Sequence, residues 1–239
     1  MVKGPAGAAR SFGVTDYDTY WVKRRSAGTD RLTRLQRFLA DVVAGLVPPG
    51  GKVLDCGVGP GNVYRLLAEA GRRMYGVEIS DEAFSLYDFD ASGIVKYDLN
   101  EGLPNFGERF DAIIAAHIIH HLEAPERYLD AVKRALAPGG VLVAAIPNIT
   151  YYRYRLGFLA GKFPPISLAH RNFQTPLEFE AMAAASGLDV VSRASAKRTL
   201  GGRLFPTFFS QDIVYVLRPA SGSAGCAAAS SPRPGAAGR

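Results

Sequence analysis

Alternating glycines behind an aspartate form the stretch of this sequence best suited to hold a ligand. Asp55 precedes Gly57, Gly59 and Gly61, and the stretch joins an apolar run typical of a β-strand to a run typical of a helix. Glycine in such a turn lets a ligand approach bare backbone beside the positive N-terminal end of the helix. Asp55 adds a fixed negative charge at the same place. The spacing therefore favours a binding loop over an ordinary tight turn, in which glycine is also common.

A second acid, Glu78, stands at the carboxyl end of the next predicted strand, near residues 73–79. In an open α/β sheet, an acid at this position reaches the ribose hydroxyls of a nucleotide bound across the first two strands. This geometry suits both nicotinamide dinucleotides and S-adenosylmethionine. The dinucleotide pattern needs glycine at position 62, where this chain has Asn62, and Asp55 is a poor neighbour for a pyrophosphate. The residues thus favour a nucleoside without phosphates.

These residues resemble the class I S-adenosylmethionine-dependent methyltransferases. The run from Asp55 to Gly61 is similar to their D-x-G-x-G-x-G signature, and Glu78 to their ribose-binding acid. The resemblance covers roughly residues 50–217 and continues through Asp98-Leu99, 110–114, 120–122, 136–140 and 146–148. Within the class, the chain is most similar to the methionine-biosynthesis W-type proteins and their small-molecule relatives. The ordered set of motifs is more specific than any single one.

The resemblance implies a fold, a cofactor and a set of binding residues. The fold is α/β and Rossmann-like, a single domain with a seven-stranded, mostly parallel sheet and helices on both faces. The cofactor is S-adenosyl-L-methionine, and the product is S-adenosyl-L-homocysteine. Asp98 would accept a hydrogen bond from the adenine amino group with Leu99 against the ring, although a turn cap is the alternative for Asp98. The expected cofactor-binding residues are Asp55, Gly57, Gly59, Gly61, Glu78, Ile79, Asp98, Leu99 and His117.

Histidines follow the fourth predicted strand at positions where relatives commonly carry carboxylates. Positions after this strand lie where cofactor and acceptor meet, and a neutral imidazole there can take a proton from a hydroxyl or an amine. His121 and His117 are therefore the candidate catalytic residues, and turn capping is the alternative for His120 and His121. Adjacent histidines point apart in most backbones, so no metal site is predicted even though three or four imidazoles can hold zinc. His170 lies further along the chain.

Residues 150–175 are expected to form the acceptor pocket and lid. The segment carries arginines among tyrosines and contains no Asp or Glu. Long connections of this kind usually have a function, and basic charge favours an anionic acceptor. A structural amphipathic helix, a partner-binding surface and an RNA-binding surface are the alternatives. The residues expected at the acceptor entrance are Tyr152, Arg153, Arg155 and His170.

Hydrophobic periodicity predicts the elements that position these residues. Strands are expected near residues 52–56, 73–79, 93–97, 110–116, 139–146, 188–192 and 211–217. Helices are expected near residues 31–46, 61–70, 80–88, 125–137 and 175–186. Alternating strands and helices imply a parallel sheet with right-handed crossovers, and the resemblance implies that the last strand is antiparallel.

The ends of the chain differ in composition from its middle. Residues 1–47 form an N-terminal aromatic and basic segment with a helix, residues 48–218 the cofactor-binding domain, and residues 219–239 a tail expected to be disordered. Tyr20 and Trp21 either close over the cofactor, as N-terminal aromatics do in similar methyltransferases, or pack in the core. The core role is favoured because aromatic side chains are most often buried for their area.

Composition limits the class of protein and the compartment. A chain of 239 residues that is 48% hydrophobic can bury a sizeable core, and it has no apolar run of about 20 residues that would cross a membrane. Cys56 and Cys226 are the only cysteines, and one lies in the binding loop, so we expect no disulfide and a cytoplasmic location. The formal net charge is +6.

The predicted function is methyl transfer from S-adenosylmethionine to an O or N nucleophile of a small, anionic molecule. An RNA methyltransferase and a cofactor-binding regulatory or partner subunit without turnover are the alternatives. Nucleic acid is the less favoured partner, and the sequence does not predict an oligomeric state.

Overall fold

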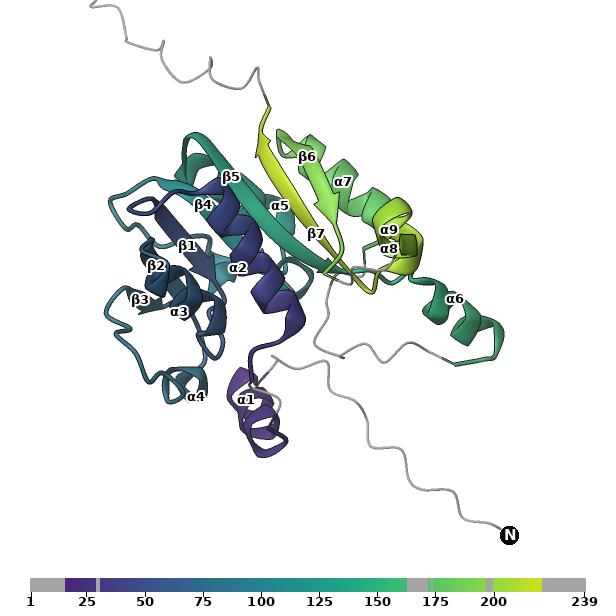
Figure 1. Ribbon diagram of the computed structural model, residues 1–239, viewed down its shortest axis with the longest axis horizontal. Coiled ribbons are helices and arrows are strands. Elements are labelled where there is room, and N and C mark those ends of the chain that lie inside the picture. Colours follow the sequence, from purple (N-terminus) through teal and green to yellow (C-terminus); the bar gives the residue numbers. More distant parts are fainter. Residues whose placement is uncertain (1–15, 29–30, 163–171, 173, 197–199, 221–239) are drawn as a thin grey trace, which may run out of the picture.

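A seven-stranded sheet organises the protein. The computed structural model describes residues 16–28, 31–162, 172, 174–196 and 200–220. The sheet has the strand order β3-β2-β1-β4-β5-β7-β6 (Figure 1). The first five strands pair in parallel, whereas β7 is antiparallel to both β5 and β6. The strands are β1 (Lys52–Cys56), β2 (Arg73–Glu78), β3 (Ile94–Lys96), β4 (Phe110–Ala116), β5 (Leu136–Pro147), β6 (Leu188–Ala194) and β7 (Asp212–Pro219). The expected α/β fold, with its antiparallel last strand, is confirmed.

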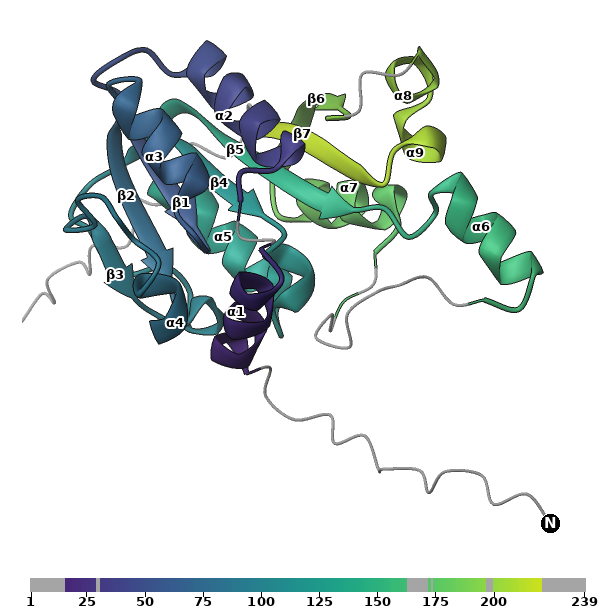
Figure 2. The ribbon, with the colours of Figure 1, turned by 60° about the horizontal axis from the view of Figure 1, so that its bottom comes forward.

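Helices cover both faces of the sheet and its carboxyl edge. In Figure 2, α2 and α3 lie on one face and α5 and α7 on the other, while α1 lies beyond the ends of the strands and α6 projects from the sheet. Within the described residues, no helix has both the length and the apolar character needed to cross a bilayer. The α-helices are α1 (Tyr17–Ser26), α2 (Arg34–Leu46), α3 (Asn62–Glu69), α4 (Asp81–Phe84), α5 (Pro125–Ala135), α6 (Tyr152–Leu159), α7 (Pro176–Ala185), α8 (Leu200–Leu204) and α9 (Pro206–Phe209). Two short 3₁₀ helices are η1 (Leu99–Glu101) and η2 (Ile119–His121).

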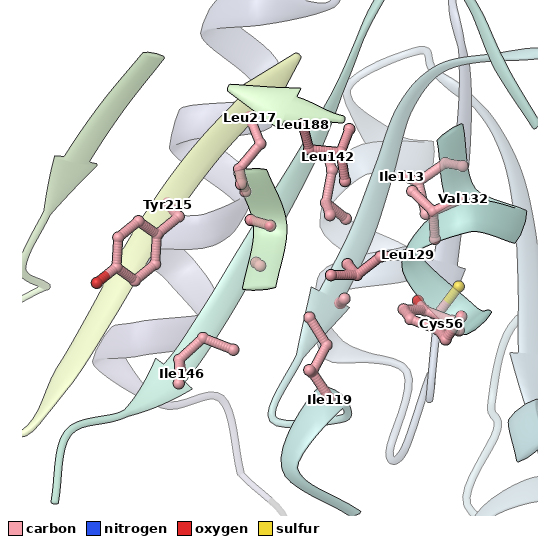
Figure 3. Packing of buried hydrophobic residues seen from close by; sticks show 14 of the residues in the cluster. Cys56, Ile113, Ile119, Leu129, Val132, Leu142, Ile146, Leu188, Tyr215 and Leu217 are labelled. Carbon is pink, nitrogen blue, oxygen red and sulfur yellow. The ribbon is translucent and has the colours of Figure 1, made fainter. Parts of the chain in front are cut away.

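The alternation of side chains along each strand produces two apolar cores. On β4, Ala112 and Ile114 pack on the side of α2 and α3, while Ile113 and Ala115 pack on the side of α5 and α7. Successive strand residues point to opposite faces, so a strand covered on both sides must be apolar throughout. Figure 3 shows the α5 side, where Leu129 and Val132 lie near strand residues of the sheet. Burial of each such side chain stabilises the fold by about 1.5–3 kcal/mol.

Helix caps fix the starts of α2 and α7. α2 begins at Arg34 rather than residue 31, because Thr33 and Gln36 form a reciprocal capping box. The capping box expected at Thr175 and Glu178 is confirmed, with hydrogen bonds of 2.7 and 3.2 Å. β5 begins at residue 136, three residues before the expected start at 139, and it follows α5 directly.

The helix expected over residues 80–88 is only one turn long. α4 starts where expected, because Ser80 Oγ accepts a hydrogen bond from the Ala83 backbone N–H at 3.1 Å, but it ends at Phe84. The chain then places Phe89 on the ring of Tyr64, with centroids 5.4 Å apart, and Tyr87 against Phe89, with centroids 5.0 Å apart. Aromatic packing against α3 therefore replaces the last helical turns.

Candidate functional site

The glycine loop between β1 and α3 has the backbone that the sequence predicts. Gly57, Gly59 and Gly61 have φ angles of 73°, 56° and 78°, a region that side chains rarely tolerate. Each glycine also faces a neighbouring side chain closely; a Cβ atom on Gly59, for instance, would lie 2.8 Å from the indole of Trp21. The three neighbours are, in the order of the glycines, Ile118, Trp21 and Phe89. Gly57, Gly59 and Gly61 thus expose bare backbone between close side chains, and we call this loop the cradle.

Glu78 is fixed at the end of β2 by three backbone N–H groups. Its Oε2 accepts from Gly59 at 2.7 Å, and its Oε1 accepts from Ile79 at 2.8 Å and from Ser80 at 2.9 Å. The side chain is 6% exposed. The carboxylate therefore lies between the glycine loop and the end of β2, beside half-buried Ile79, where ribose hydroxyls are bound in open α/β sheets.

Asp55 is buried next to this second carboxylate. It is 3% exposed, and its burial, together with the charge of Glu78, raises its pKa to about 8. A buried acid of this kind gains most from a nearby positive charge. The ammonium and sulfonium groups of S-adenosylmethionine carry such charges, so the electrostatics of the loop fit this cofactor.

The hydroxyl of Tyr87 is a feature of the site that the sequence analysis did not single out. It is buried, and no hydrogen-bond partner is found for it among the described residues. Burial and the charges of Glu78 and Asp55 raise its pKa well above the ordinary value. A buried hydroxyl without a partner is costly, and the polar atoms of a nucleoside would satisfy it. The cradle, the two acids and this hydroxyl together fit an adenosyl cofactor.

Asp98 and Leu99 lie at the end of β3, where the sequence places them. Asp98 caps η1: its Oδ1 accepts from both the backbone N–H and the side-chain amide of Asn100 at 2.9 Å. Leu99 is 8% exposed and belongs to the apolar core on the α5 side. The capping alternative for Asp98 is thus present in the structure, and its role toward adenine stays a prediction.

His117 follows β4 directly and has an unusual backbone. Its φ is 57°, the only positive value for a non-glycine residue in the described part of the chain. Its Nε2 lies 3.4 Å from Oδ1 of Asp212, the first residue of β7. Desolvation of the imidazole lowers its pKa, the charge of Asp212 opposes this, and Arg24 lowers the pKa further. The imidazole is therefore neutral at neutral pH and can accept a proton.

The two other described histidines of this region lie beside His117. The rings of His117 and His120 have centroids 5.7 Å apart, and those of His120 and His121 are 4.3 Å apart. His120 is 3% exposed, and His121 is half-buried with Tyr17 against its edge at 6.1 Å. In the described ranges, no group of three or more His, Cys, Asp or Glu side chains could hold a metal ion.

Helix α1 closes over the carboxyl ends of β1, β2 and β4 (Figure 2). Asp18 Oδ1 accepts from Ser80 Oγ at 2.5 Å and from the Glu82 backbone N–H at 3.1 Å. Trp21 faces Gly59, as described above, and Tyr17 meets His121. α1 contains no buried residue, so the core role favoured for Tyr20 and Trp21 is wrong, and the covering role fits the structure.

The acceptor segment leaves the end of β5 and forms α6. Arg155 Nε donates to the Thr150 carbonyl at 2.6 Å, and its guanidinium lies 5.4 Å from the centre of the Phe208 ring. Tyr152 stacks on the same phenylalanine at 5.8 Å. These contacts tie α6 to α9. His170 lies outside the described residues, so the expected acceptor entrance stays a prediction.

Tyr154, Asp212 and Arg24 are the residues of this edge that the sequence did not single out. The charge of Asp212 contributes to raising the pKa of Tyr154, behind its desolvation by burial. Asp212 comes from the last strand of the chain, and Arg24 from an N-terminal helix. Their meeting at His117 depends on the antiparallel path of β7 and on the docking of α1. The only sequence signal was an acid at the start of a predicted strand.

Known proteins share the sequence pattern of this chain. Residues 31–193 match the methyltransferase domain family. The ubiquinone biosynthesis O-methyltransferase of Hydrogenovibrio crunogenus is 26% identical over 147 residues, covering 57% of this chain and 61% of that protein. The mitochondrial ubiquinone biosynthesis O-methyltransferase of Mus musculus is 26% identical over 155 residues, covering 59% of this chain and 42% of that protein. The chain thus spans less than two thirds of the length of these relatives.

Solved structures share the fold. The CcbJ methyltransferase from Streptomyces caelestis has a TM-score of 0.63 at 20% identity, covering 79% of this chain and 91% of that chain. The 1,6-didemethyltoxoflavin-N1-methyltransferase from Burkholderia thailandensis, with bound S-adenosylhomocysteine, also has a TM-score of 0.63, at 19% identity, covering 92% of this chain and 93% of that chain. The family match, the strand order and the glycine loop with its two acids agree. The chain belongs to the methyltransferase domain family, and its sheet has the strand order of the class I S-adenosylmethionine-dependent methyltransferase fold.

Proposed function

We propose that this protein methylates an O or N nucleophile on a small, anionic molecule. The observation that carries the proposal is the position of His117 at the end of β4, beside the glycine loop and its two buried acids. This arrangement puts a neutral base at the edge of the sheet where the methyl donor would lie. S-adenosylmethionine supplies the methyl group, and S-adenosylhomocysteine is the product that remains after the transfer.

The residues of the chain have distinct roles in this proposal. Gly57, Gly59 and Gly61 admit the cofactor to bare backbone, and Glu78 holds its ribose with Ile79 beside it. Asp55 attracts the positively charged portion of the cofactor, while Asp98 and Leu99 receive the adenine. His117 takes the proton of the acceptor as methyl transfer proceeds, and His121 is the second candidate for that role. The positioning of the two reactants supplies most of the acceleration.

Several features support a small, anionic acceptor. The curated relatives are named as O-methyltransferases of ubiquinone biosynthesis, and a relative in fold as an N1-methyltransferase of a small molecule. Arg24 on α1 lies near His117, and residues 150–175 contain no acid. Charge-assisted contacts to an anion from such arginines are each worth about 1.5–3 kcal/mol. Placement near the W-type proteins, a cytoplasmic location and an acceptor entrance on α6 remain parts of the proposal.

Binding of S-adenosylhomocysteine tests the cofactor half of this proposal. Calorimetry on the full chain should detect S-adenosylhomocysteine and no nicotinamide dinucleotide. Glu78→Gln keeps the shape of the side chain but removes its charge, and it should weaken binding by about 1–3 kcal/mol. Glu126→Gln, an exposed residue of α5, is the matched control and should bind normally. Binding of NAD without S-adenosylhomocysteine would overturn the assignment.

Turnover tests the acceptor half. Release of S-adenosylhomocysteine should occur with pools of small anionic metabolites that carry hydroxyl or amine groups. Release with RNA alone would favour the RNA methyltransferase alternative. Tight binding of the cofactor with no turnover on either pool would favour the regulatory subunit.

A further inference from the structure

Asp212 reaches the site because β7 is antiparallel to its neighbours β5 and β6. In the register of β5 and β7, Asp212 pairs with Pro147 at the carboxyl end of β5. The antiparallel direction therefore places the first residue of β7 at the edge where the parallel strands end. His117 follows β4 at that edge, and its Nε2 lies 3.4 Å from Asp212 Oδ1. A carboxylate and an imidazole from strands far apart in the sequence are thus brought within contact distance.

The backbone of His117 adopts an uncommon conformation. Its φ of 57° lies in the left-handed region, where a residue with a side chain is uncommon. The backbone N–H of His117 donates to the Ala145 carbonyl on β5 at 3.0 Å, which keeps this conformation attached to the sheet. Such outliers are strained and cluster at functional sites.

The groups that face the imidazole come from four elements. Asp212 on β7 is negative, Arg24 on α1 is positive, and His120 on η2 packs edge-on at 5.7 Å. Tyr154 on α6 is a further neighbour of Asp212: burial raises the pKa of Tyr154, and the charge of Asp212 raises it further. Asp212 favours the protonated imidazole, whereas desolvation and Arg24 favour the neutral one. The pKa of His117 is lowered as a result.

We propose that Asp212 is the positioning residue that makes His117 the general base of this enzyme. In the neutral imidazole, Nε2–H points to Asp212 Oδ1, which leaves the lone pair on Nδ1. The acceptor O–H or N–H gives its proton to Nδ1, its electron pair forms the bond to the methyl carbon, and the C–S pair returns to sulfur. Asp212 stays ionised beside the imidazolium, which later releases the proton to solvent. This inference rests on the proposed function, and it adds to it a residue that acts only through His117.

The pairing is tested first without any substrate. Imidazole ¹⁵N and ¹³C signals of His117, assigned with His117→Gln, are followed against pH in the full chain. The wild-type protein should show the Nε2–H tautomer. Asp212→Asn should lower the pKa of His117 by about one pH unit, because a carboxylate at this range raises a neighbouring pKa by about that much or more. Asp189→Asn, an exposed acid on β6, is the matched control and should leave the signals unchanged. An unchanged His117 titration in Asp212→Asn would overturn the pairing.

Turnover then separates positioning from a structural role. Asp212→Asn should lower kcat about 10- to 100-fold. This loss is smaller than that from removing a general base, because His117 itself is kept. The affinity for S-adenosylhomocysteine should stay the same. The acidic limb of the pH profile should move to lower pH, and Asp212→Glu should recover part of the activity. A normal kcat in Asp212→Asn would refute the catalytic assignment. Failure of the wild-type chain to bind S-adenosylhomocysteine would instead refute the proposed function, and the NMR titration would still decide the pairing.

Discussion

Asp55 links the stability of the fold to the binding of the cofactor. Burial and the charge of Glu78 disfavour its ionised form and raise its pKa from the ordinary 3.8 to about 8 in the folded protein. Between about pH 4 and about pH 8 the folded protein therefore binds more protons at this residue than the unfolded chain does. Its contribution to the free energy of unfolding is present below this window and is lost as the pH rises through it.

Replacement of Asp55 should separate these two effects. Asp55→Asn should raise the free energy of unfolding at pH 8 by about 1–3 kcal/mol, since it removes a buried charge, and should weaken S-adenosylhomocysteine binding. Urea denaturation between pH 5 and pH 9 in about half-unit steps measures the first effect, and calorimetry the second. Asp189→Asn serves as the surface control. A pH slope that is the same in wild type and Asp55→Asn would contradict the assignment.

Two tyrosines near the glycine loop offer a matched pair of substitutions. Tyr87→Phe removes a buried hydroxyl that has no partner among the described residues, so stability should stay the same or rise while S-adenosylhomocysteine binds about 2- to 10-fold more weakly. Tyr64→Phe removes a hydroxyl that donates to the Met74 carbonyl at 3.2 Å. It should cost about 1 kcal/mol of stability with little change in binding. Thermal unfolding and calorimetry report both quantities, and a reversed pattern would show that Tyr87 faces protein rather than cofactor.

At the scale of elements, Asp18 is a main anchor of α1 over the glycine loop, beside the ion pair of Arg25 with Glu82 at 3.3 Å. Asp18 binds Ser80 and the start of α4, and Trp21, the only tryptophan of the chain, lies against Gly59. Asp18→Ala should release α1, so the emission of Trp21 should move to longer wavelength as the indole meets water. S-adenosylhomocysteine should then bind about 2- to 10-fold more weakly, the usual worth of lost hydrogen bonds.

The control for this experiment lies on the same helix. Lys23→Ala changes an exposed residue of α1 and should leave both emission and affinity as in wild type. Addition of S-adenosylhomocysteine to wild type should change the emission of Trp21, because the cofactor and the indole share the cradle. An Asp18→Ala protein with unchanged emission would mean that other contacts hold α1 in place.

Local sequence patterns predicted an element well where its burial pattern or its cap lies within its own residues. The strands of the sheet core are apolar on both faces, and the α7 start carries a capping box that the sequence displays. α4 and α1 were not predicted correctly. α4 stops where the chain turns to stack Phe89 on Tyr64 and to pack Tyr87 against Phe89, and α1 forms with no buried residue of its own. Contacts with residues distant in the sequence determine where α4 ends and that α1 forms. Hydrophobic periodicity within a segment does not record such contacts.

For the whole molecule, the sequence predicted the glycine loop with its two acids but not the group of residues around His117. The glycines, Asp55 and Glu78 lie close together along the chain, so their spacing alone places them at one turn. The set of His117, Asp212, Arg24 and Tyr154 draws on three elements, α1, α6 and β7, and on the turn after β4. Its assembly depends on the position of β7 between β5 and β6 and on the direction of that strand. Register between strands this distant is a property of the folded sheet, not of any local pattern.

The late position of β7 in the chain has a consequence for biosynthesis. A ribosome delivers the glycine loop and Glu78 more than a hundred residues before Asp212, so a nascent chain can assemble the donor cradle while the carboxylate beside His117 is still inside the exit tunnel. Insertion of β7 between two strands that are already made is then the step that completes the acceptor edge. A polypeptide released before that step would carry the histidine without its partner. On the proposed function, competence to react would therefore arrive only once β7 has been made, after the residues proposed to hold the methyl donor.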